Sequence, residues 1–212
     1  MNPWLTIDLP DYENHMCHAS VCQLQTLNEM MDSQINKYKV KTAMILGIAG
    51  GNGLNHIDPG KFEKVYGVDI NSSYLALCME RYKNLSGIFE PIHADLTQNI
   101  SALPKADLLV ADLLLEYIGL DCFLQVIEQV SPEYISCILQ MNTDKSFVAD
   151  SPYIHVFDGL EDVYHPITLY ELTNAMFQIH YELNIADERE LPNCKKLLQL
   201  DYKKAKEIVH WK

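Results

Sequence analysis

A glycine-rich turn and a series of carboxylates occur in the first half of the chain, each directly after a short apolar segment. Gly51-Asn52-Gly53 follows the first segment, Asp69 the second, Asp95 the third and Asp112 the fourth. A glycine-rich turn lets a ligand approach the backbone, and a carboxylate at the end of the next strand can accept hydrogen bonds from both hydroxyls of a ribose. A further carboxylate can accept one from an exocyclic amine such as that of adenine. This order predicts a nucleoside site.

The glycine turn does not match the patterns that hold phosphates. The dinucleotide fingerprint G-x-G-x-x-G fails because His56 stands where its third glycine is needed, and no lysine follows the turn as a P-loop requires. A nicotinamide-dependent dehydrogenase is therefore disfavoured. The expected ligand is a nucleoside that carries no phosphates.

Short buried strands alternating with amphipathic helices must position these residues. Alternation of this kind predicts parallel strands with helices on both faces of one sheet. Ligands of such sheets bind beyond the carboxyl ends of the strands, where the glycine turn and the acids stand. The expected strands are residues 41–49, 64–68, 87–93, 107–111 and 134–140.

The flanking segments are expected to be helical at the start and to form a hairpin at the end. Apolar periodicity predicts one amphipathic helix over 14–39, and Asn71 or Ser72 is expected to cap the helix after the second strand. Asp121 is expected to cap another. A Thr168-x-x-Glu171 capping box opens a later helix, and strand-like runs at 180–186 and 196–202 predict an antiparallel hairpin.

Composition excludes several classes of function. The 212 residues are 48% hydrophobic and have a formal net charge of −13, so disorder and strong binding to a polyanion such as DNA or RNA are both disfavoured. No apolar run reaches the roughly 18 residues of a membrane span, and no signal peptide is recognisable. The six cysteines show no CxxC pattern. These features predict a cytoplasmic protein without a membrane partner.

Four segments, in order, resemble the motifs of class I, Rossmann-like S-adenosylmethionine (SAM)-dependent methyltransferases, over about residues 12–204. The family's [D/E]-x-G-x-G-x-G corresponds to residues 47–53, Gly-Ile-Ala-Gly-Gly-Asn-Gly, and its second motif to residues 66–70, Tyr-Gly-Val-Asp-Ile. His93-Ala94-Asp95-Leu96 resembles the third. Residues 107–112, Asp-Leu-Leu-Val-Ala-Asp, followed by Leu-Glu-Tyr-Ile at 115–118, resemble the fourth.

The resemblance implies a single doubly wound α/β domain over residues 1–212, with a mostly parallel seven-stranded sheet and an antiparallel C-terminal hairpin. Residues 1–40 would form an N-terminal helical cap, 41–141 the SAM-binding half, and 142–212 the acceptor-side loop, helix and hairpin. The implied reaction transfers a methyl group from SAM to a small-molecule acceptor and leaves S-adenosylhomocysteine (SAH).

Carried over position by position, the resemblance assigns the cofactor contacts. Asp69 is expected to bind the ribose, Asp95 the adenine amine, and the backbone of Asp112 the amino-acid end, while residues of the N-terminal helix would cover the cofactor. The full set of expected cofactor-binding residues is Gly47, Ala49, Gly51, Gly53, Asp69, Ile70, Asp95, Leu96, Asp112, Tyr12 and Met16, with His15 beside the last two.

The chain departs from the family pattern at two positions. Gly47 stands in place of the opening acid, which in the family helps to hold the amino-acid moiety of SAM, and Ala49 replaces the first glycine. Ala49 is expected to be tolerated easily if its φ is negative. The departure at Gly47 keeps open a second hypothesis, a non-catalytic SAM- or SAH-binding protein that works through a partner.

Catalytic residues are less well defined than cofactor residues, because methyl transfer relies mainly on positioning and desolvation. Glu116, Tyr117 and His165 are candidates by location. Each assignment has a plainer alternative: Asp69 as a helix cap, Asp95 as a turn-former with Thr97, Asp112 and Glu116 as solvated loop acids, Tyr117 as a packed aromatic, Tyr12 and Met16 as helix packing. No metal is expected, since the cluster of His15, Cys17, His18 and Cys22 overlaps the apolar helix face.

Overall fold

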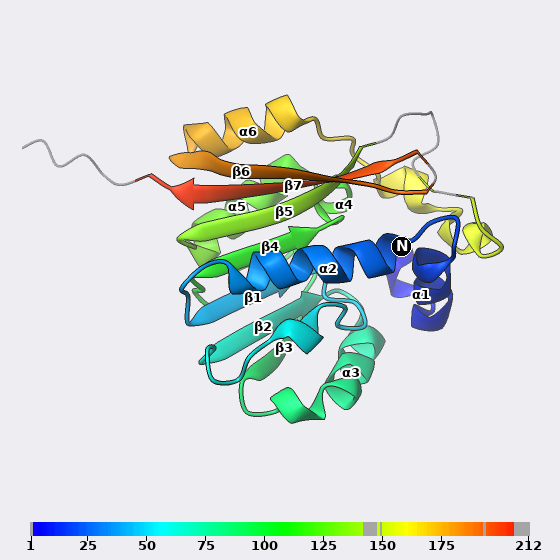
Figure 1. The fold of residues 1–212 in the computed structure, drawn as a ribbon, viewed down its shortest axis with the longest axis horizontal. Coiled ribbons are helices and arrows are strands. Elements are labelled where there is room, and N and C mark those ends of the chain that lie inside the picture. Colours follow the sequence, from blue (N-terminus) through cyan, green and yellow to red (C-terminus); the bar gives the residue numbers. More distant parts are fainter. Residues whose placement is uncertain (1, 142–147, 149, 193, 206–212) are drawn as a thin grey trace, which may run out of the picture.

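The computed structural model describes residues 2–141, 148, 150–192 and 194–205, in which one seven-stranded sheet runs in the order β3-β2-β1-β4-β5-β7-β6 (Figure 1). Strands β1 to β5 pair in parallel, and β7 is antiparallel to both β5 and β6. The expected fold class, with its parallel sheet and C-terminal hairpin, is confirmed. The strands are β1 Thr42–Leu46, β2 Lys64–Asp69, β3 Phe89–His93, β4 Leu108–Asp112, β5 Tyr134–Met141, β6 Tyr181–Glu190 and β7 Lys196–Lys204.

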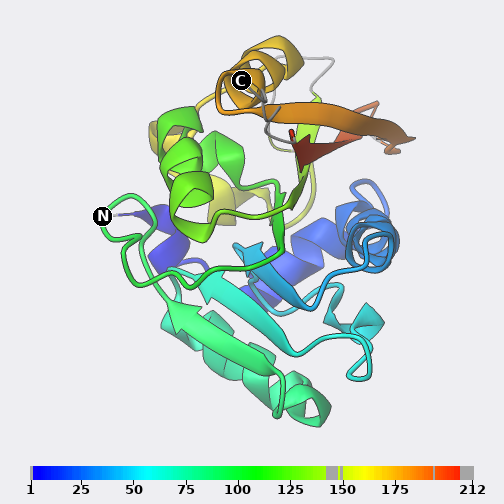
Figure 2. The ribbon, with the colours of Figure 1, turned by 90° about the vertical axis from the view of Figure 1, so that its left-hand side faces the viewer.

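Helices cover both faces of this sheet. The α-helices are α1 Leu9–Cys17, α2 Gln23–Asn36, α3 Ser72–Arg81, α4 Leu115–Ile118, α5 Leu120–Val130 and α6 Leu169–Gln178, and the short 3₁₀ helices are η1 Pro3–Leu5, η2 Leu54–His56, η3 Lys83–Leu85, η4 Ile154–Phe157 and η5 Leu160–Val163. Successive residues of a strand point to opposite faces, so Ala43 and Ile45 pack with α2 and α3, while Met44 and Leu46 pack with α5 and α6. Figure 2 shows α2 and α5 on opposite sides of the sheet.

Local sequence signals fix several element ends as expected. The Asn71 side chain accepts hydrogen bonds from the backbone of Ser73 and Tyr74 and so caps α3, and Thr168 and Glu171 form the predicted capping box of α6. Pro91 lies within β3, at an edge of the sheet, where its missing N–H leaves no ladder bond unmade. The cap expected at Asp121 is wrong: Gly119 occupies the N-cap of α5, and Asp121 lies in its first turn.

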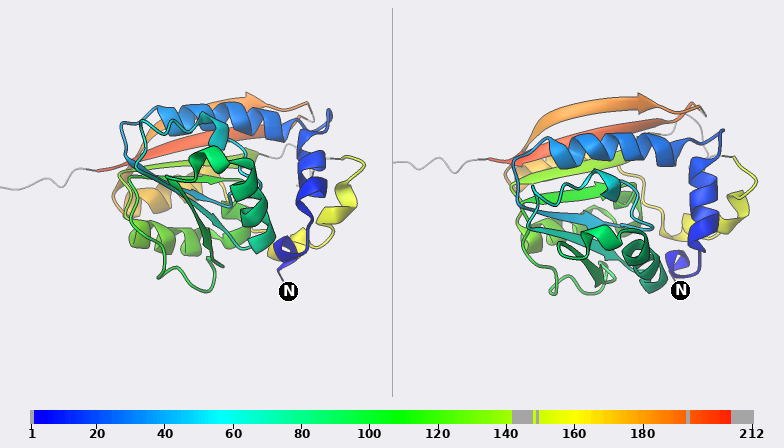
Figure 3. Two further views of the ribbon diagram at one scale, coloured as in Figure 1. Left: turned by 90° about the horizontal axis from the view of Figure 1, so that it is seen from below. Right: turned by 60° about the horizontal axis from the view of Figure 1, so that its bottom comes forward.

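The single N-terminal helix expected over 14–39 is also wrong, because the chain turns between α1 and α2. Cys22 takes a left-handed φ of +52° at this turn, and Ser20 Oγ donates to the backbone oxygen of Asp150 at 2.8 Å. Val21 is fully buried there. These long-range contacts override the helical periodicity, so that α1 turns away from α2 and lies across the end of the sheet (Figure 3).

A small apolar cluster joins α1 and its preceding residues to the segment after β5. Ile7 is buried against Phe157 and Leu160, and Trp4 and Tyr12 pack beside them. In Figure 1 the N-terminal region and η4–η5 lie next to each other at the end of the sheet where β4 terminates. The remainder of the loop expected over 142–166, namely 142–147 and 149, lies outside the described residues.

A fully buried carboxylate anchors the C-terminal hairpin to the sheet and to the residues after α2. Asp201, in β7, accepts hydrogen bonds from Ser136 Oγ at 2.5 Å, Tyr38 Oη at 2.7 Å and Gln199 Nε2 at 2.9 Å, and forms an ion pair with Lys37 at 3.2 Å. Because both oxygens are paired, this buried charge holds the hairpin in register. Within the described part of the chain, no helix combines the length and apolar character needed to cross a bilayer.

Candidate active site

The glycine turn after β1 is shaped by four positive φ values. They are +65° at Gly47, +47° at Ala49, +86° at Gly51 and +90° at Gly53. A Cβ atom at Gly51 would lie 2.6 Å from the Tyr82 ring, and one at Gly53 would overlap with Met31. These two glycines therefore let the turn pack against the helices on one face of the sheet. The condition of a negative φ, under which Ala49 was expected to be tolerated easily, is not met.

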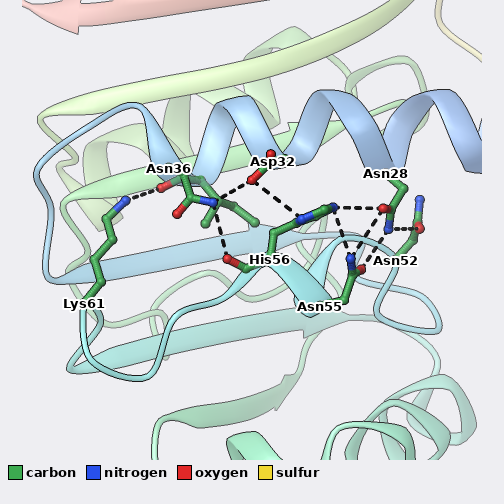
Figure 4. A network of polar contacts seen from close by, with 8 residues as sticks. Asn28, Asp32, Asn36, Asn52, Asn55, His56 and Lys61 are labelled. Atoms are coloured by element: carbon green, nitrogen blue, oxygen red, sulfur yellow. Dashed lines mark hydrogen bonds and ion pairs between the residues drawn. The ribbon is translucent and has the colours of Figure 1, made fainter.

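A network of polar side chains fastens this turn to α2 (Figure 4). Asn28, on α2, donates to Asn52 Oδ1 at 2.9 Å and to Asn55 Oδ1 at 2.8 Å, and its own oxygen lies 2.8 Å from His56 Nε2. Asn52 in turn donates to the backbone oxygen of Leu24 at 3.0 Å. The turn is thus held by side-chain hydrogen bonds in addition to its own backbone bonds.

A pocket of about 750 Å³, the central pocket, opens at the carboxyl ends of β1, β2 and β4. The structure brings eight of the expected cofactor residues together in its lining. They are Tyr12, Gly47, Ala49, Asp69, Ile70, Asp95, Leu96 and Asp112.

The expected residues Gly51, Gly53 and Met16 are not among those that line the central pocket. The two glycines pack toward α3 and α2, and Met16 lines a neighbouring pocket. Trp4, Leu113, Leu114 and Tyr117 were not assigned to the cofactor from the sequence, although they line the central pocket. Periodicity gives no signal for Trp4, which precedes the first regular helix.

Asp69 uses both carboxyl oxygens to hold the backbone around the pocket. Oδ2 accepts from the N–H of Ala49 at 2.9 Å, and Oδ1 accepts from the N–H of Asn71 at 2.8 Å. Burial raises the pKa of Asp69, and these backbone hydrogen bonds act in the opposite direction. Since Asn71 caps the helix, Asp69 joins β2 to the glycine turn and is not the cap itself.

Asp95 forms a turn with Thr97, which is the plainer of its two expected roles. Its Oδ1 accepts from the N–H of Thr97 at 2.9 Å and from the hydroxyl at 2.7 Å. The turn does not remove Asp95 from the site, because the residue also lines the central pocket beside Leu96. Asp95 thus forms the turn and also lines the central pocket.

Asp112 presents a carboxyl group with only one hydrogen-bonded oxygen. Gln34 Nε2 donates to Oδ1 at 2.8 Å, whereas Oδ2 is buried and has no partner among the described residues. Burial raises the pKa of Asp112 to about 7, and the negative charge of Asp201 acts in the same direction. The alternative of a solvated loop acid at Asp112 is therefore wrong. Gln34, which holds the Asp112 carboxyl group by this hydrogen bond, was not singled out from the sequence.

A second pocket of about 560 Å³, the aromatic pocket, shares Trp4, Tyr12, Leu113 and Tyr117 with the central pocket. It lies between α1, α4, β5 and the residues around η4 and η5. The other residues that line it are His15, Met16, Gln23, Glu116, Gln140, Val148, Phe157, Leu160 and Tyr164. Tyr12 and Met16 thus combine helix packing with a place in a pocket wall.

Glu116 is buried in the wall of the aromatic pocket, with 4% of its surface exposed. The backbone N–H of Gln140 donates to Oε1 at 3.2 Å, and Oε2 has no partner within the described structure. Burial raises the pKa of Glu116 to about 7. The alternative of a solvated loop acid is wrong for Glu116 too. A single acid within the apolar run 113–120 was the available signal for its burial.

The other two catalytic candidates lie in different surroundings. Tyr117 packs edge-on against Trp4, with ring centroids 5.1 Å apart, and burial raises its pKa, so the phenol stays protonated. The exposed side chain of His165 lines a separate hollow with Gly119 and Cys122, and only its backbone N–H reaches the oxygen of Glu116. The structure therefore brings Glu116 and Tyr117 together and does not place the His165 side chain with them.

Comparisons with known proteins match the fold of this chain. No family model and no curated protein sequence matches it. The N-methyltransferase NodS of Bradyrhizobium japonicum, solved with SAH, superimposes with a TM-score of 0.68 at 10% identity, over 97% of this chain and 100% of that one. Magnesium protoporphyrin IX methyltransferase of Synechocystis, also with SAH, gives 0.66 at 8% identity, over 95% and 96%.

A third similar structure is the methyltransferase domain of the bacterial protein CtHen1-C, with a TM-score of 0.60 at 12% identity over 94% of this chain and 100% of that domain. At these identities the likeness establishes the fold. The chain has the Rossmann-like fold of class I SAM-dependent methyltransferases.

Proposed function

We propose that this protein is a SAM-dependent methyltransferase whose acceptor is a small molecule. The observation that carries the proposal is the gathering of eight expected cofactor residues around the central pocket, which shares four lining residues with a second, mostly apolar pocket. The fold shared with solved methyltransferases supports the same function. A fold alone would not be sufficient, because one fold serves many functions.

The residues of the central pocket suit the parts of SAM. Each oxygen of Asp69 makes one hydrogen bond to the backbone and retains acceptor capacity for the ribose hydroxyls. Asp95 would accept from the adenine amine, with Ile70 and Leu96 against the ring. The free Oδ2 of Asp112 would accept from the ammonium group, in a pocket that Gly47 also lines. Asp112 would thereby supply the carboxylate that Gly47 lacks.

The aromatic pocket is the proposed place of the acceptor. When bound, SAM supplies an electrophilic methyl carbon, whose bond to sulfur breaks as a lone pair of the acceptor attacks it. Trp4, Tyr12 and Tyr117 line both pockets and would orient the acceptor and exclude water. The enclosure by α1 and the residues around η4–η5 favours a small acceptor.

A second candidate is a SAM- or SAH-binding protein without turnover. The specific observation in its favour is the loss of the family's acid at Gly47, together with the left-handed Ala49 at its first glycine position. The two candidates differ in one measurement: methyl transfer to an amine, phenol and thiol panel, followed by SAH release. Cofactor binding with no turnover on any of these acceptors would favour the second candidate.

The first test is thermal unfolding of the protein with SAM, SAH, NADH or buffer. A ligand that binds only the native state stabilises it, by about 2.7 kcal/mol at a hundredfold excess over its Kd. We expect an upward shift with SAM and SAH and none with NADH. No shift with SAM or SAH would reject the proposed function.

The Asp69→Ala variant tests the site assignment, and we expect it to weaken SAM binding more than tenfold. Asp107→Ala is the matched control, since Asp107 also accepts hydrogen bonds from two backbone N–H groups, those of Lys41 and Thr42, but at the opposite end of the sheet. The control should lose stability and keep its affinity for SAM. Equal losses of affinity in the two variants would show a general effect on folding instead.

A further inference from the structure

The described lining of the aromatic pocket contains one acidic side chain and no basic residue other than His15. Glu116 is the only carboxylate in its described lining, and that lining contains no lysine or arginine. One oxygen of this carboxyl group is buried without a partner. A buried carboxylate without a partner is costly, and a ligand that donates hydrogen bonds and carries positive charge would remove that cost. An anionic acceptor would instead face a second negative charge.

The other ionisable groups of the pocket do not compensate Glu116. Burial lowers the pKa of His15 to about 4, and its Nδ1 lies 2.7 Å from Ser151 Oγ, so the imidazole is neutral at pH 7. Burial raises the pKa values of Tyr12 and Tyr117, so both phenols are neutral as well. Among the described residues that line the pocket, none places a positive charge beside Glu116, and a cationic ligand would supply one.

Aromatic rings form much of the remaining wall. His15 and Phe157 lie with ring centroids 4.5 Å apart, Trp4 and Tyr12 5.9 Å apart, and Tyr12 and Phe157 6.5 Å apart. A cation near the faces of such rings is attracted by their quadrupoles. Rings also favour an apolar or aromatic body attached to that cation.

We propose that the aromatic pocket binds the methyl acceptor as a protonated amine on an apolar or aromatic body, with the Glu116 carboxylate as its counter-charge. This inference rests on the proposed function, because it names the acceptor class for the same site. An ammonium nitrogen has no lone pair, so one N–H proton passes to Glu116 before the nitrogen attacks. Transfer then forms the N–C bond, breaks the S–C bond with both electrons going to sulfur, and leaves the proton on Glu116, from which water removes it.

The protonation state of Glu116 sets a pH dependence for this binding. Its pKa is raised to about 7 by burial, so the carboxylate fraction grows from pH 6 to pH 8, while an alkylamine with a pKa near 10 stays protonated over that range. His15, Tyr12 and Tyr117, which share the pocket, do not change charge between these values. Amine affinity is therefore expected to rise severalfold across this interval.

The experiment is calorimetric titration of the protein, with and without saturating SAH, by three matched probes at pH 6 and pH 8. The probes are 2-phenylethylamine, 2-phenylethanol and phenylacetate, which share a ring and differ in charge. At pH 8 we expect the amine to bind at least tenfold more tightly than the alcohol, and phenylacetate to bind most weakly. Equal affinity of amine and alcohol, or preference for phenylacetate, would overturn the inference.

Three variants test whether Glu116 is responsible for the preference for the amine. Glu116→Gln keeps an acceptor oxygen for Gln140 and should reduce amine affinity at least tenfold, to the level of the alcohol. Glu161→Gln removes the same charge from an exposed position on η5 and should leave the affinity for the amine unchanged. Phe157→Leu keeps apolar volume but removes a ring, and should weaken the amine more than the alcohol. An unchanged preference for the amine in Glu116→Gln would contradict the assignment.

SAH binding by the same samples separates this inference from the proposed function. If SAH binds and the amine preference is missing, the inference fails and the methyltransferase proposal stands. If SAH does not bind, the methyltransferase proposal fails, and the titrations without SAH still decide whether the pocket selects amines. SAH binding by Glu116→Gln shows in addition that this variant is folded.

Discussion

Two kinds of buried carboxylate occur in and beside the sheet. Asp201 is surrounded by donors that satisfy both of its oxygens, whereas Asp112 and Glu116 each leave one oxygen without a partner in the described structure. An unpartnered buried polar group costs about 1–3 kcal/mol or more, and such groups with shifted pKa values concentrate at functional sites. We interpret Asp201 as a structural residue, and Asp112 and Glu116 as residues whose free oxygens bind ligands.

The Asp112→Asn variant should raise stability and weaken SAH binding at the same time. The pKa of Asp112 is raised from its ordinary value near 3.9 to about 7, so between these values the native state holds a proton that the unfolded chain has released, and stability falls as pH rises. Asparagine keeps the acceptor for Gln34 and cannot ionise. Urea unfolding should show a gain in stability that is larger at pH 8 than at pH 5, by about 2–3 kcal/mol.

The pH dependence is what makes this test specific. A gain of equal size at both pH values would mean that packing, and not ionisation, is responsible. A gain in stability without any loss of SAH affinity would remove Asp112 from the cofactor site. Gln34→Ala offers a comparison, because it removes the side-chain donor to Asp112 and should lower stability most at pH 8.

Ala49 is strained in its left-handed conformation, with φ at +47°. Left-handed backbone costs a residue with a Cβ about 1–2 kcal/mol relative to the right-handed form, and glycine avoids this cost. Ala49→Gly should therefore stabilise the protein by about 0.5–1 kcal/mol. Ala43→Gly, in the buried strand β1, is the control and should destabilise it. Chemical unfolding measures the free energy of unfolding of both variants. A lower value for Ala49→Gly than for the wild type would contradict the inference that Ala49 is strained.

At this scale the sequence predicts positions better than roles. Asp69, Asp95 and Asp112 could be assigned to one site because each ends a parallel strand, and the ends of parallel strands meet at one edge. The contacts of their side chains could not be predicted, because the partners Ala49, Asn71 and Gln34 depend on tertiary packing. The pocket around Glu116 could not be predicted either, because Phe157 and Leu160, which line it, come from a distant part of the chain.

Secondary elements position the site through a few long-range contacts. Helix α2 reaches the glycine turn through Asn28, which engages Asn52, Asn55 and His56. The strands were predictable because continuous apolar runs between turn signals are typical of buried parallel strands. The break between α1 and α2 was not, since no proline or glycine marks it and Ser20 finds its partner in a distant segment.

The Asn28→Ala variant should loosen the glycine turn without disturbing the rest of the sheet. Removing one side chain leaves the amides of Asn52 and Asn55 and the imidazole of His56 with fewer partners, which should cost about 1–2 kcal/mol. We also expect SAH affinity to fall several-fold, because Ala49 belongs to the same turn. Asn174→Ala, exposed on α6, is the matched control and should behave as wild type in both measurements.

Across the whole molecule, the two pockets are closed by segments that are far apart in the chain. The N-terminal residues and α1 contribute Trp4 and Tyr12 to both pockets. The residues around η4 and η5 line the aromatic pocket and pack against the N-terminal region through Ile7, Phe157 and Leu160 (Figures 1 and 3). This cluster is small compared with the two that flank the sheet. Regions with few buried apolar contacts open at lower free energy than the main core.

Hydrogen exchange should therefore report cofactor binding in these walls. Addition of SAH is expected to slow exchange of backbone amides in residues 4–17 and 151–164. The reason is that Tyr12, in the first segment, lines the central pocket and packs against the second segment. Exchange in β6 and α6, which lie away from the pocket, should not change. Slowing that is uniform along the chain would indicate general stabilisation, and slowing in neither wall would show that they do not enclose the ligand.

The position of β7 between β5 and β6 also has a consequence for how the chain is made. During synthesis the apolar strand β5 emerges well before β7, and until β7 arrives its edge presents unpaired backbone groups. A nascent chain at this stage can form the parallel strands but exposes a template for pairing with other chains. Insertion of β7 and the burial of Asp201 beside Ser136 close that edge. The same strand that completes the sheet thus removes this open edge from the growing chain.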